Sequence, residues 1–269
     1  MKLRGLSAVV TGAGNGIGRA IAEELAARGC QVALWDIDDA AASAVAAAIA
    51  NRGGRALAQK VDVSDPASVE SAAARLRVSW GAVEILVNNA GVSVAGRFDA
   101  VPLADLHWIF GVNFWGAVHC TRALLPLLCA APQARLVYVL SGFALYGFPS
   151  KTAYCSTKFA LRGLGEALRS ELHGTSVRVV AVYPPAVATQ IVQRGRSVNA
   201  SKQQREAEFL AEHGMPLPQV AARMVRAIEQ GSPRVLIGGT NHLIDLATRL
   251  APTPMQRLIG ALRDRIPFV

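Results

Sequence analysis

The sequence predicts an α/β fold: one doubly wound parallel sheet of the Rossmann type, about seven strands wide, with helices on both faces. Three observations support this prediction. Short apolar runs alternate with helical patterns from one end of the chain to the other. These runs are nearly continuous, which is typical of strands that are buried on both faces. A cluster of glycines, Gly12, Gly16 and Gly18, separates the first strand from the first helix.

The expected strands and helices follow one another in order. Strands are expected at residues 8–11, 32–35, 56–61, 85–87, 135–140, 177–183 and 235–237. Helices are expected at residues 18–27, 40–51, 66–80, 102–130, 154–173 and 218–229. The polar residues 188–217 interrupt this series and are predicted to form a substrate lid. Right-handed crossovers would bring the carboxyl ends of the strands to one edge, where ligands bind.

Composition limits the class of protein. With 269 residues, 52% of them hydrophobic, and no linker, residues 1–269 are expected to form one domain. The net charge of +9 comes from scattered arginines without a basic run, which argues against nucleic-acid binding. No signal peptide or membrane-length apolar run is visible, so a cytoplasmic protein without membrane contact is expected. Cys30, Cys120, Cys129 and Cys155 lack metal-ligand spacing, which predicts buried free thiols and no metal site.

The glycine turn is interpreted as a dinucleotide site. Gly12, Gly16 and Gly18 follow a strand and precede a helix, so a pyrophosphate could approach main-chain N–H groups at the positive helix end. The alternative is a plain tight turn in which glycine serves only to reach positive φ. The order of strand, turn and helix favours the dinucleotide.

An acidic residue closes the second strand. Asp36 lies twenty residues after Gly16, where a carboxylate can accept hydrogen bonds from both adenosine ribose hydroxyls and would repel a 2′-phosphate. No Lys or Arg follows before Arg52, and Asn15 rather than a basic residue occupies the loop. NAD is therefore predicted over NADP. The alternative role, capping the next helix, suits the aspartates after Asp36 better.

Short side chains follow two further strands. Asp62 and Val63 end the third strand, and Asn89, Ala90 and Gly91 follow the fourth. Such residues often only form turns. Their position at the ligand edge of the sheet favours contact with a cofactor.

Three residues indicate acid–base chemistry on an oxygen. Tyr154 and Lys158 are four residues apart and so share a helix face, and Ser141 ends the preceding strand. A phenol with a pKa of about 10 exchanges protons poorly near neutrality, so a neighbouring cation is needed to favour the phenolate. Lys158 is expected to be that cation. Ser141 can donate a hydrogen bond to the same substrate oxygen, and its alternative role is a cap or turn.

With these residues in place, the chain resembles the short-chain dehydrogenase/reductase family in its short, single-domain branch, over about residues 5–190. The resemblance implies that Ser141 and Tyr154 hold a carbonyl or alcohol oxygen, with Tyr154 as general acid/base. Lys158 would bind the nicotinamide ribose while lowering the tyrosine pKa. Asn113 would hold a proton-relay water through a helix irregularity.

The resemblance also implies the cofactor site, with one departure. Pro185 stands where family members usually carry a glycine after the sixth strand, while Thr189, four residues later, remains available for the nicotinamide carboxamide. Proline removes an N–H and fixes φ, which alters the pocket at this point. The expected cofactor contacts are Gly12, Asn15, Gly16, Ile17, Gly18, Asp36, Ile37, Asp62, Val63, Asn89, Ala90, Gly91, Tyr154, Lys158, Pro184, Val187 and Thr189.

The substrate pocket is expected to be apolar. Its predicted walls, besides Ser141 and Tyr154, are Phe143, Leu145, Tyr146, Phe148, Pro185, Ala186, Ile191, Val192, Phe209 and Leu210. Some of these side chains could instead belong to the core or to an interface. Only Arg194 and Arg196 could swing in from the lid toward a substrate carboxylate. We therefore predict an enzyme that transfers a hydride between NAD(H) and an apolar secondary alcohol or ketone.

Two other functions could use these residues. An epimerase or dehydratase would employ the same Tyr154 and Lys158 pair, but such proteins are longer chains with a different glycine spacing. A non-catalytic NAD-binding regulatory or scaffold protein would be expected to lose Ser141, Tyr154 or Lys158, and all three are present.

Residues 249–269 form a distinct tail. Met255, Leu258, Ile259 and Leu262 have helical spacing among several arginines. Packing against the lid or a neighbouring subunit is favoured over an anionic membrane, because the apolar stripe is wide enough for only one protein contact. The resemblance implies a homodimer or homotetramer, in which the apolar helices at 103–130 and 154–173 could bury faces.

Overall fold

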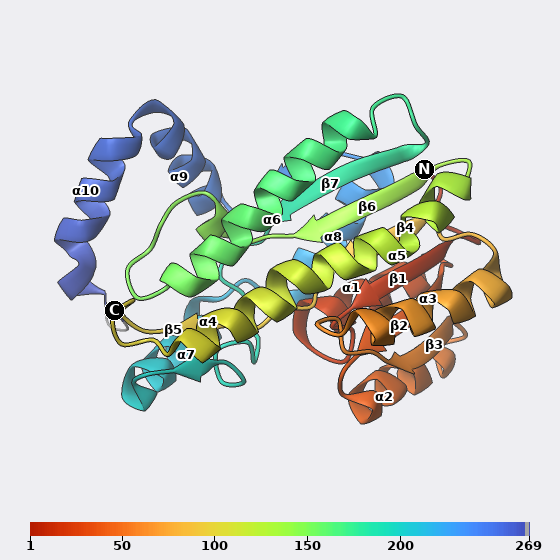
Figure 1. The fold of residues 1–269 in the computed structure, drawn as a ribbon, viewed down its shortest axis with the longest axis horizontal. Coiled ribbons are helices and arrows are strands. Elements are labelled where there is room, and N and C mark those ends of the chain that lie inside the picture. The colour runs from red at the N-terminus through yellow and green to blue at the C-terminus, as the bar shows by residue number, and fades with distance from the viewer. Residues whose placement is uncertain (267–268) are drawn as a thin grey trace.

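The structure is a computed structural model that describes residues 1–266 and residue 269, so residues 267–268 of the predicted tail lie outside it. Within the described residues, seven parallel strands form the central sheet in the order β3-β2-β1-β4-β6-β7-β9 (Figure 1). They are β1 Ser7–Thr11, β2 Gln31–Asp36, β3 Arg55–Lys60, β4 Ile85–Asn88, β6 Ala134–Val139, β7 Val177–Tyr183 and β9 Arg234–Leu236. The predicted doubly wound parallel sheet is therefore confirmed.

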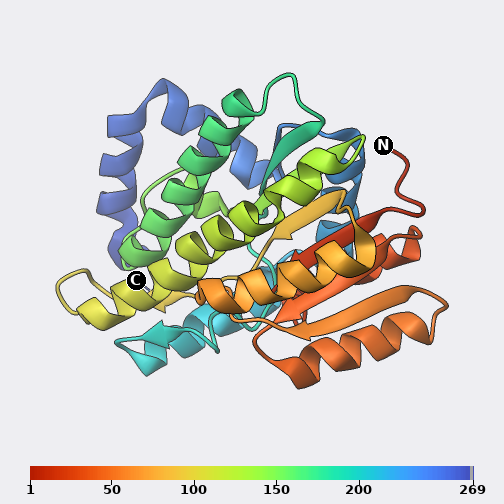
Figure 2. The ribbon, with the colours of Figure 1, turned by 45° about the vertical axis from the view of Figure 1, so that its right-hand side comes forward.

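Helices cover both faces of this sheet (Figures 1 and 2). One face is covered by α3 (Pro66–Trp80), α5 (Gly116–Ala130) and α6 (Thr152–Glu171). The other face is covered by α1 (Gly16–Ala27), α2 (Asp39–Ala50) and α8 (Leu217–Gln230). The order of the strands reverses between β1 and β4, which is where ligands bind in sheets of this kind.

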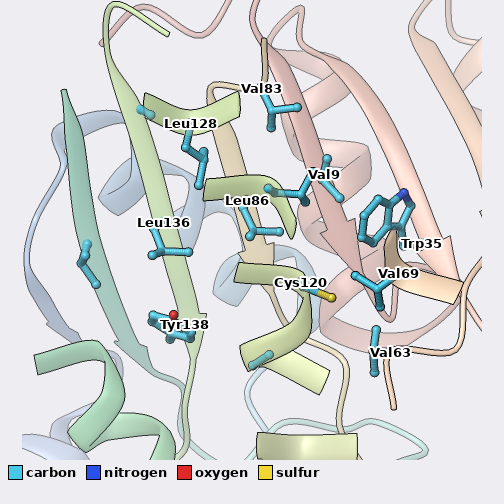
Figure 3. Close-up of a cluster of buried hydrophobic side chains, with 14 of the residues drawn as sticks. Val9, Trp35, Val63, Val69, Val83, Leu86, Cys120, Leu128, Leu136 and Tyr138 are labelled. Carbon is cyan, nitrogen blue, oxygen red and sulfur yellow. The ribbon is translucent and has the colours of Figure 1, made fainter. Parts of the chain in front are cut away.

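Successive residues of each strand point to opposite faces, so the strands supply two separate cores. Val9, Leu136 and Tyr138 belong to the cluster under α3 and α5 (Figure 3). Their neighbours Val10 and Val137 belong to the cluster on the other face. This division explains why the strand sequences are apolar throughout rather than alternating.

Local signals set the starts of several helices. The Asp38 carboxylate accepts the main-chain N–H of Ala41 at 3.0 Å and caps α2. Asp65 caps α3 in the same way, and Pro66 occupies the first position of that helix. The capping role proposed for the aspartates after Asp36 is thus observed at Asp38.

The long helix expected at residues 102–130 is divided by a π-helical turn. α4 (Leu103–Phe110) leads into the turn Gly111–Trp115, and α5 follows it without a break. Asn113 lies buried in this turn. Turns of this type are frequent at functional sites, and this one is the helix irregularity that the resemblance implies.

The polar residues 188–217, called the lid below, contain a short strand and a helix. β8 (Arg196–Ser197) pairs in parallel with β5 (Val94–Ala95). α7 (Ala200–His213) begins after Asn199, whose Oδ1 accepts the N–H of Lys202 at 3.0 Å.

Two helices follow the last strand. α9 (Gly239–Leu250) is not among the predicted elements, whereas α10 (Pro252–Leu262) falls in the predicted tail. They form an arm beside α6, and the C-terminus lies near β5 and α7 (Figure 1). All 11 residues of α10 are described, and none of them is buried.

Two expectations about residue classes can be compared with the structure. Cys30, Cys120 and Cys155 are buried free thiols, but Cys129 is exposed near the end of α5, so its predicted burial is wrong. Among the described residues, no cluster of three or more His, Cys, Asp or Glu could hold a metal ion. None of the described helices is long and apolar enough to cross a membrane.

Candidate active site

The glycine loop between β1 and α1 packs on the residues that follow β4. Gly12 has a φ of +64°, a conformation that glycine adopts without strain. A Cβ on Gly18 would lie 2.1 Å from the carbonyl oxygen of Gly12, so only glycine fits there. Asn89 Nδ2 supports the loop by donating to the carbonyl oxygens of Thr11 at 2.9 Å and Gly12 at 3.3 Å. The result is a preformed cradle of bare main chain at the start of α1.

Asp36 lies beside this cradle at the end of β2. Its Oδ2 accepts the main-chain N–H of Gly14 at 2.7 Å, and its Oδ1 accepts that of Asp38 at 3.0 Å. Ile37, the next residue, is 62% exposed. The carboxylate is therefore held in place while the edge around it stays accessible.

The residues after β3 are engaged in local structure. Asp62 Oδ1 accepts hydrogen bonds from the N–H and the hydroxyl of Ser64, at 2.9 and 2.6 Å. Val63 is buried so close to α5 that a Cβ on Gly116 would lie 2.6 Å from it. The turn-forming role considered for Asp62 is thus observed, at the edge where a cofactor contact is also expected.

Ser141, Tyr154 and Lys158 line one cavity at the carboxyl edge of the sheet. Ser141 follows β6, and its Oγ accepts the main-chain N–H of Phe143 at 3.2 Å. Tyr154 and Lys158 lie one turn apart on α6, with the lysine Nζ 5.7 Å from the centre of the tyrosine ring. This Nζ donates to the carbonyl oxygen of Val139 at 3.0 Å. The end of β6 therefore fixes the serine and the lysine relative to the tyrosine.

Burial dominates the proton affinities of two of these residues. It raises the pKa of Tyr154 to about 12, and a hydrogen bond with Ser141 opposes this effect. It lowers the pKa of Lys158 to about 8. The expected lowering of the tyrosine pKa is not observed here, because burial raises the pKa by more than the hydrogen bond with Ser141 lowers it. At neutral pH the phenol keeps its proton, which suits it to act as an acid.

Asn113 fastens the π-helical turn to the loop after β4 and to α6. Its Oδ1 accepts the N–H of Val92 at 2.7 Å. Its Nδ2 donates to the carbonyl oxygen of Val92 at 3.0 Å and to Thr157 Oγ1 at 3.2 Å. The side-chain amide is therefore occupied in positioning α6.

The cavity has a volume of about 890 Å³ and lies between the sheet edge and the lid. Most of the predicted substrate residues line it: Phe143, Tyr146, Phe148, Pro185, Ala186, Ile191, Val192, Phe209 and Leu210. Several predicted cofactor residues also line it: Ile17, Asn89, Gly91, Pro184, Val187 and Thr189. Leu145 does not line the cavity, because it packs into the core cluster under α5. Asn15 and Gly16 line a second cavity of about 550 Å³ between α1 and the lid.

Arg194 and Arg196, which could have reached a substrate carboxylate, do not line the larger cavity. Arg194 reaches the glycine loop, where an Asn15 amide oriented with its oxygen toward the guanidinium accepts from Nη1 at 3.0 Å and Nη2 at 3.2 Å. Arg196 pairs with Asp105 at 2.6 Å and lies over Trp108, 3.9 Å from the ring centre. The lid therefore brings a cation from far along the chain to the glycine loop, which itself contains no Lys or Arg.

The unusual Pro185 lies at the base of the lid. It lines the cavity, and a Cβ on Gly238 would stand 3.2 Å from its Cβ. Gly238 has a φ of +90°, which only glycine adopts readily. Thr189 meets the glycine loop, since a Cβ on Gly16 would lie 3.5 Å from its Cγ2. The proline thus leaves Thr189 at the junction of the loop and the cavity.

Sequence reasoning missed two contributions to this cavity. Lys151 and Glu206 form an ion pair in its wall, with Nζ and Oε2 2.6 Å apart. α9 contributes Asn241, whose Nδ2 donates to the carbonyl oxygen of Tyr183 at 3.0 Å. Lys151 precedes Tyr154 by one helical turn, a spacing that could have marked it. No local signal marks Glu206 or Asn241.

The family described as short chain dehydrogenase matches residues 7–200 of this sequence. The chain belongs to this family. The matched residues begin with β1 and end at the start of α7, so they include the glycine loop and the catalytic candidates Ser141, Tyr154 and Lys158. The resemblance stated from those motifs is confirmed.

Other members of the family match this short-chain dehydrogenase over most of its length. SadH of Mycobacterium tuberculosis, which bears the provisional name of an oxidoreductase, is 35% identical over 265 residues, covering 96% of this chain and 95% of SadH. A Burkholderia phymatum short-chain dehydrogenase in complex with NAD has a TM-score of 0.86 at 28% identity, with 96% of each chain covered. An alcohol dehydrogenase from Thermococcus sibiricus, complexed with 5-hydroxy-NADP, has a TM-score of 0.74 at 25% identity, covering 86% of this chain and 95% of that one. This short-chain dehydrogenase is therefore an oxidoreductase.

Proposed function

We propose that this short-chain dehydrogenase transfers a hydride between NAD(H) and an apolar secondary alcohol or ketone. The observation that carries the proposal is the convergence of Ser141, Tyr154 and Lys158 on one cavity whose other walls are largely aromatic and aliphatic. The regulatory or scaffold alternative offers no reason for this convergence. The epimerase or dehydratase alternative has no support from the relatives described above.

The cradle and the edge of the sheet fit a nicotinamide adenine dinucleotide. The glycine loop leads into the N-terminus of α1, where a helix has main-chain N–H groups without partners inside the helix, which suit a pyrophosphate. Asp36 suits the hydroxyls of an adenosine ribose and disfavours a phosphate there. Ile17 and Thr189 line the same cavity as Tyr154, so the nicotinamide would lie between them. When bound, the dinucleotide supplies the donor or acceptor of the hydride.

The residues of the chain supply proton transfer and orientation. In ketone reduction, the Tyr154 hydroxyl donates its proton to the substrate oxygen, and in alcohol oxidation the phenolate accepts it. Ser141 donates a hydrogen bond to the same oxygen and fixes its position. Lys158, with its pKa lowered to about 8, still carries its charge at pH 7 and stabilises the phenolate.

The aromatic wall excludes water from this chemistry. The Phe143 ring centre lies 5.0 Å from that of Phe148, 5.7 Å from Tyr146 and 6.2 Å from Tyr154. A rigid apolar wall next to the proton donor favours substrates with rings or alkyl chains.

NAD-linked oxidation of secondary alcohols, ranging from short aliphatic to steroid-sized, tests the proposal. We expect the larger apolar alcohols to be oxidised by the native protein and not by Tyr154→Phe. Failure to convert any of these alcohols, or the matching ketones, with either NAD(H) or NADP(H) would overturn it.

We also propose that the protein assembles as a homodimer or homotetramer. Trp115, the last residue of the π-helical turn before α5, is 51% exposed, and Phe159 on α6 is 40% exposed. Large apolar side chains exposed on neighbouring helices are typical of surfaces that a second copy covers.

A further inference from the structure

A buried ion pair joins the lid to the helix that carries Tyr154. Lys151 directly precedes α6, and Glu206 lies on α7 in the lid. Their charged atoms are 2.6 Å apart, and the two side chains are only 3% and 8% exposed. Removing two charges from water is costly, and their mutual attraction seldom repays the whole cost. A pair in this position therefore calls for a role beyond stability.

This pair lies in the wall of the 890 Å³ cavity, together with Ser141 and Tyr154. Three residues of the Lys, Arg, Asp and Glu types are among the described residues that line the cavity, namely Lys151, Glu206 and Lys158, and His213 lines it too. Lys158 belongs to the reacting end and donates to Val139. Lys151 and Glu206 thus form an ion pair in a cavity wall that consists largely of apolar side chains, such as Phe143, Phe148 and Phe209.

The pair is close enough to the reacting end to act on one substrate molecule. Lys151 directly precedes α6, three residues before Tyr154, and both residues line the same cavity. The charge of Glu206 also contributes, after burial, to the raised pKa of Tyr154. One substrate molecule in this cavity can therefore contact both the pair and Tyr154.

The pair has hydrogen-bonding capacity to spare. An ammonium group has three donors and a carboxylate has about four acceptor sites. Within the described residues, the structure records a single hydrogen bond that involves the Lys151 Nζ or the Glu206 carboxylate, the one between them. The pair as a whole is neutral, so a ligand group that both donates and accepts, without charge, matches it best. A hydroxyl group does both.

We propose that Lys151 and Glu206 bind a second hydroxyl group of the substrate, remote from the carbon that is oxidised or reduced. The hydroxyl would accept from the Lys151 ammonium and donate to the Glu206 carboxylate. This inference rests on the proposed function and narrows its substrate class to apolar alcohols or ketones that carry a further hydroxyl group.

Matched pairs of cyclohexanones test the proposal. Each pair carries, opposite the carbonyl, either an alkyl group or the hydroxyalkyl group with the same number of heavy atoms: ethyl or hydroxymethyl, propyl or hydroxyethyl, butyl or hydroxypropyl. Binding is measured by calorimetry on the native protein saturated with the oxidised dinucleotide, so that no ketone can be reduced. We expect the hydroxyl member of at least one pair to bind at least about tenfold more tightly than its alkyl partner.

Variants separate recognition from a purely structural role. Glu206→Gln and Lys151→Met should each reduce the preference for hydroxyl. The double variant Lys151→Met with Glu206→Leu replaces the pair by apolar side chains that can pack together, and should reverse the preference. Glu166→Gln breaks an exposed ion pair with Arg162 on the same helix and should leave the preference unchanged.

The outcomes distinguish this inference from the proposed function. Equal binding within every pair, absence of binding, or a preference that survives in the double variant would overturn the inference. Turnover of the same ketones with reduced dinucleotide is measured separately. Turnover without a preference for hydroxyl counts against this inference alone, whereas preferential binding without turnover counts against the proposed function alone.

Discussion

Asp36 Oδ2 accepts the main-chain N–H of Gly14 at 2.7 Å, so the acidic side chain and the glycine loop form one unit. A carboxylate in this place serves two purposes. It offers acceptors to ribose hydroxyls and a negative charge against a 2′-phosphate, and it also fixes the loop on which a pyrophosphate would lie. Substitutions that remove the charge and those that remove the hydrogen bond should therefore differ.

We predict that NAD(H) binds at least tenfold more tightly than NADP(H), a difference of about 1.4 kcal/mol or more. Asp36→Ala should narrow this gap because it removes the charge. Asp36→Asn should narrow it too, while keeping an acceptor for Gly14 and hence more of the affinity for NAD(H). Fluorescence titration with all four dinucleotides measures the gap. Equal or tighter binding of NADP(H) by the native protein would refute the preference.

Arg194 offers a second test of how the cofactor is held. Its guanidinium reaches Asn15 in the glycine loop from the lid. We expect Arg194→Ala to weaken NAD(H) and NADP(H) by similar factors, several-fold each, because the cation would face the pyrophosphate that both share. The control is Arg205→Ala, at an exposed arginine on α7. A loss confined to NADP(H) would show instead that Arg194 serves a 2′-phosphate.

Tyr154→Phe tests the acid–base assignment. The phenyl ring keeps the edge contact with Phe143, whose ring centre is 6.2 Å away, so the fold and NAD binding should survive. Loss of the proton donor should lower kcat by at least about a hundredfold on any substrate found. Lys158→Met should impair both dinucleotide binding and turnover. Near-normal turnover by Tyr154→Phe would show that another group moves the proton.

The pKa of Lys158 predicts a pH-dependent stability. Burial lowers this pKa from 10.5 to about 8, so between these values the unfolded chain holds a proton that the folded chain has released. The free energy of unfolding of the native protein therefore rises as the pH increases from about 8 to 10.5. Below pH 8 the buried lysine is charged, and the full cost of burying that charge lowers the stability. Relative to the native protein, Lys158→Met should gain on the order of 3 kcal/mol at pH 7. Urea unfolding should show this gain shrinking between pH 8 and 10; a constant or growing gain would contradict the pKa.

The strands of the main sheet and the helices packed on it are predicted well, because their signals lie within a few neighbouring residues of the chain. Most strands of the main sheet and the helices packed on it have apolar patterns of their own, and α2 and α3 also have the capping residues Asp38 and Asp65. The catalytic candidates are found for the same reason, because Tyr154 and Lys158 are fixed relative to each other by one helical turn.

α9 escapes prediction because its pattern is inverted. Its buried residues are Asn241 and Asp245, whereas Leu243, Leu246 and Leu250 are exposed. The buried aspartate is satisfied by Arg234 on β9, and that partner is known only once the fold brings the two together. The hydrophobic periodicity of α9 therefore predicts that the leucine face is buried, whereas the structure buries the opposite, polar face.

The polar contacts of the lid are missed for a related reason. Glu206 is 55 residues from Lys151, and Arg194 is far from Asn15 in the chain, so neither pairing has a sequence signal. The reach of a charged side chain depends on the path of the lid over the cavity. That path is set by long-range packing, such as the pairing of β8 with β5.

The tail supplies the last prediction. All of α10 is described and none of it is buried, yet Lys202 Nζ on the lid donates to the main-chain carbonyl of Val269. Deleting residues 252–269 should therefore cost little stability and should raise KM, because the lid loses a tie, or should disturb assembly if a second copy covers α10. Thermal unfolding, steady-state kinetics and sedimentation equilibrium measure the three effects. Lys202→Ala is the matched variant, since it removes the tie and keeps the helix.

Two results would separate these roles of the tail from the membrane alternative. If the hydrogen bond between Lys202 and Val269 holds the lid, Lys202→Ala should raise KM as the deletion does. An unchanged KM in both variants would exclude a role of this hydrogen bond in substrate binding. The membrane alternative has its own test. Leu258 and Leu262 are exposed near Arg263, and apolar side chains beside a cation can bind an anionic bilayer. We expect no co-sedimentation of the intact chain with vesicles of anionic lipid at physiological salt. Co-sedimentation that disappears on deletion of residues 252–269 would show that α10 binds the membrane, because Lys202→Ala leaves the apolar stripe intact and should not abolish it.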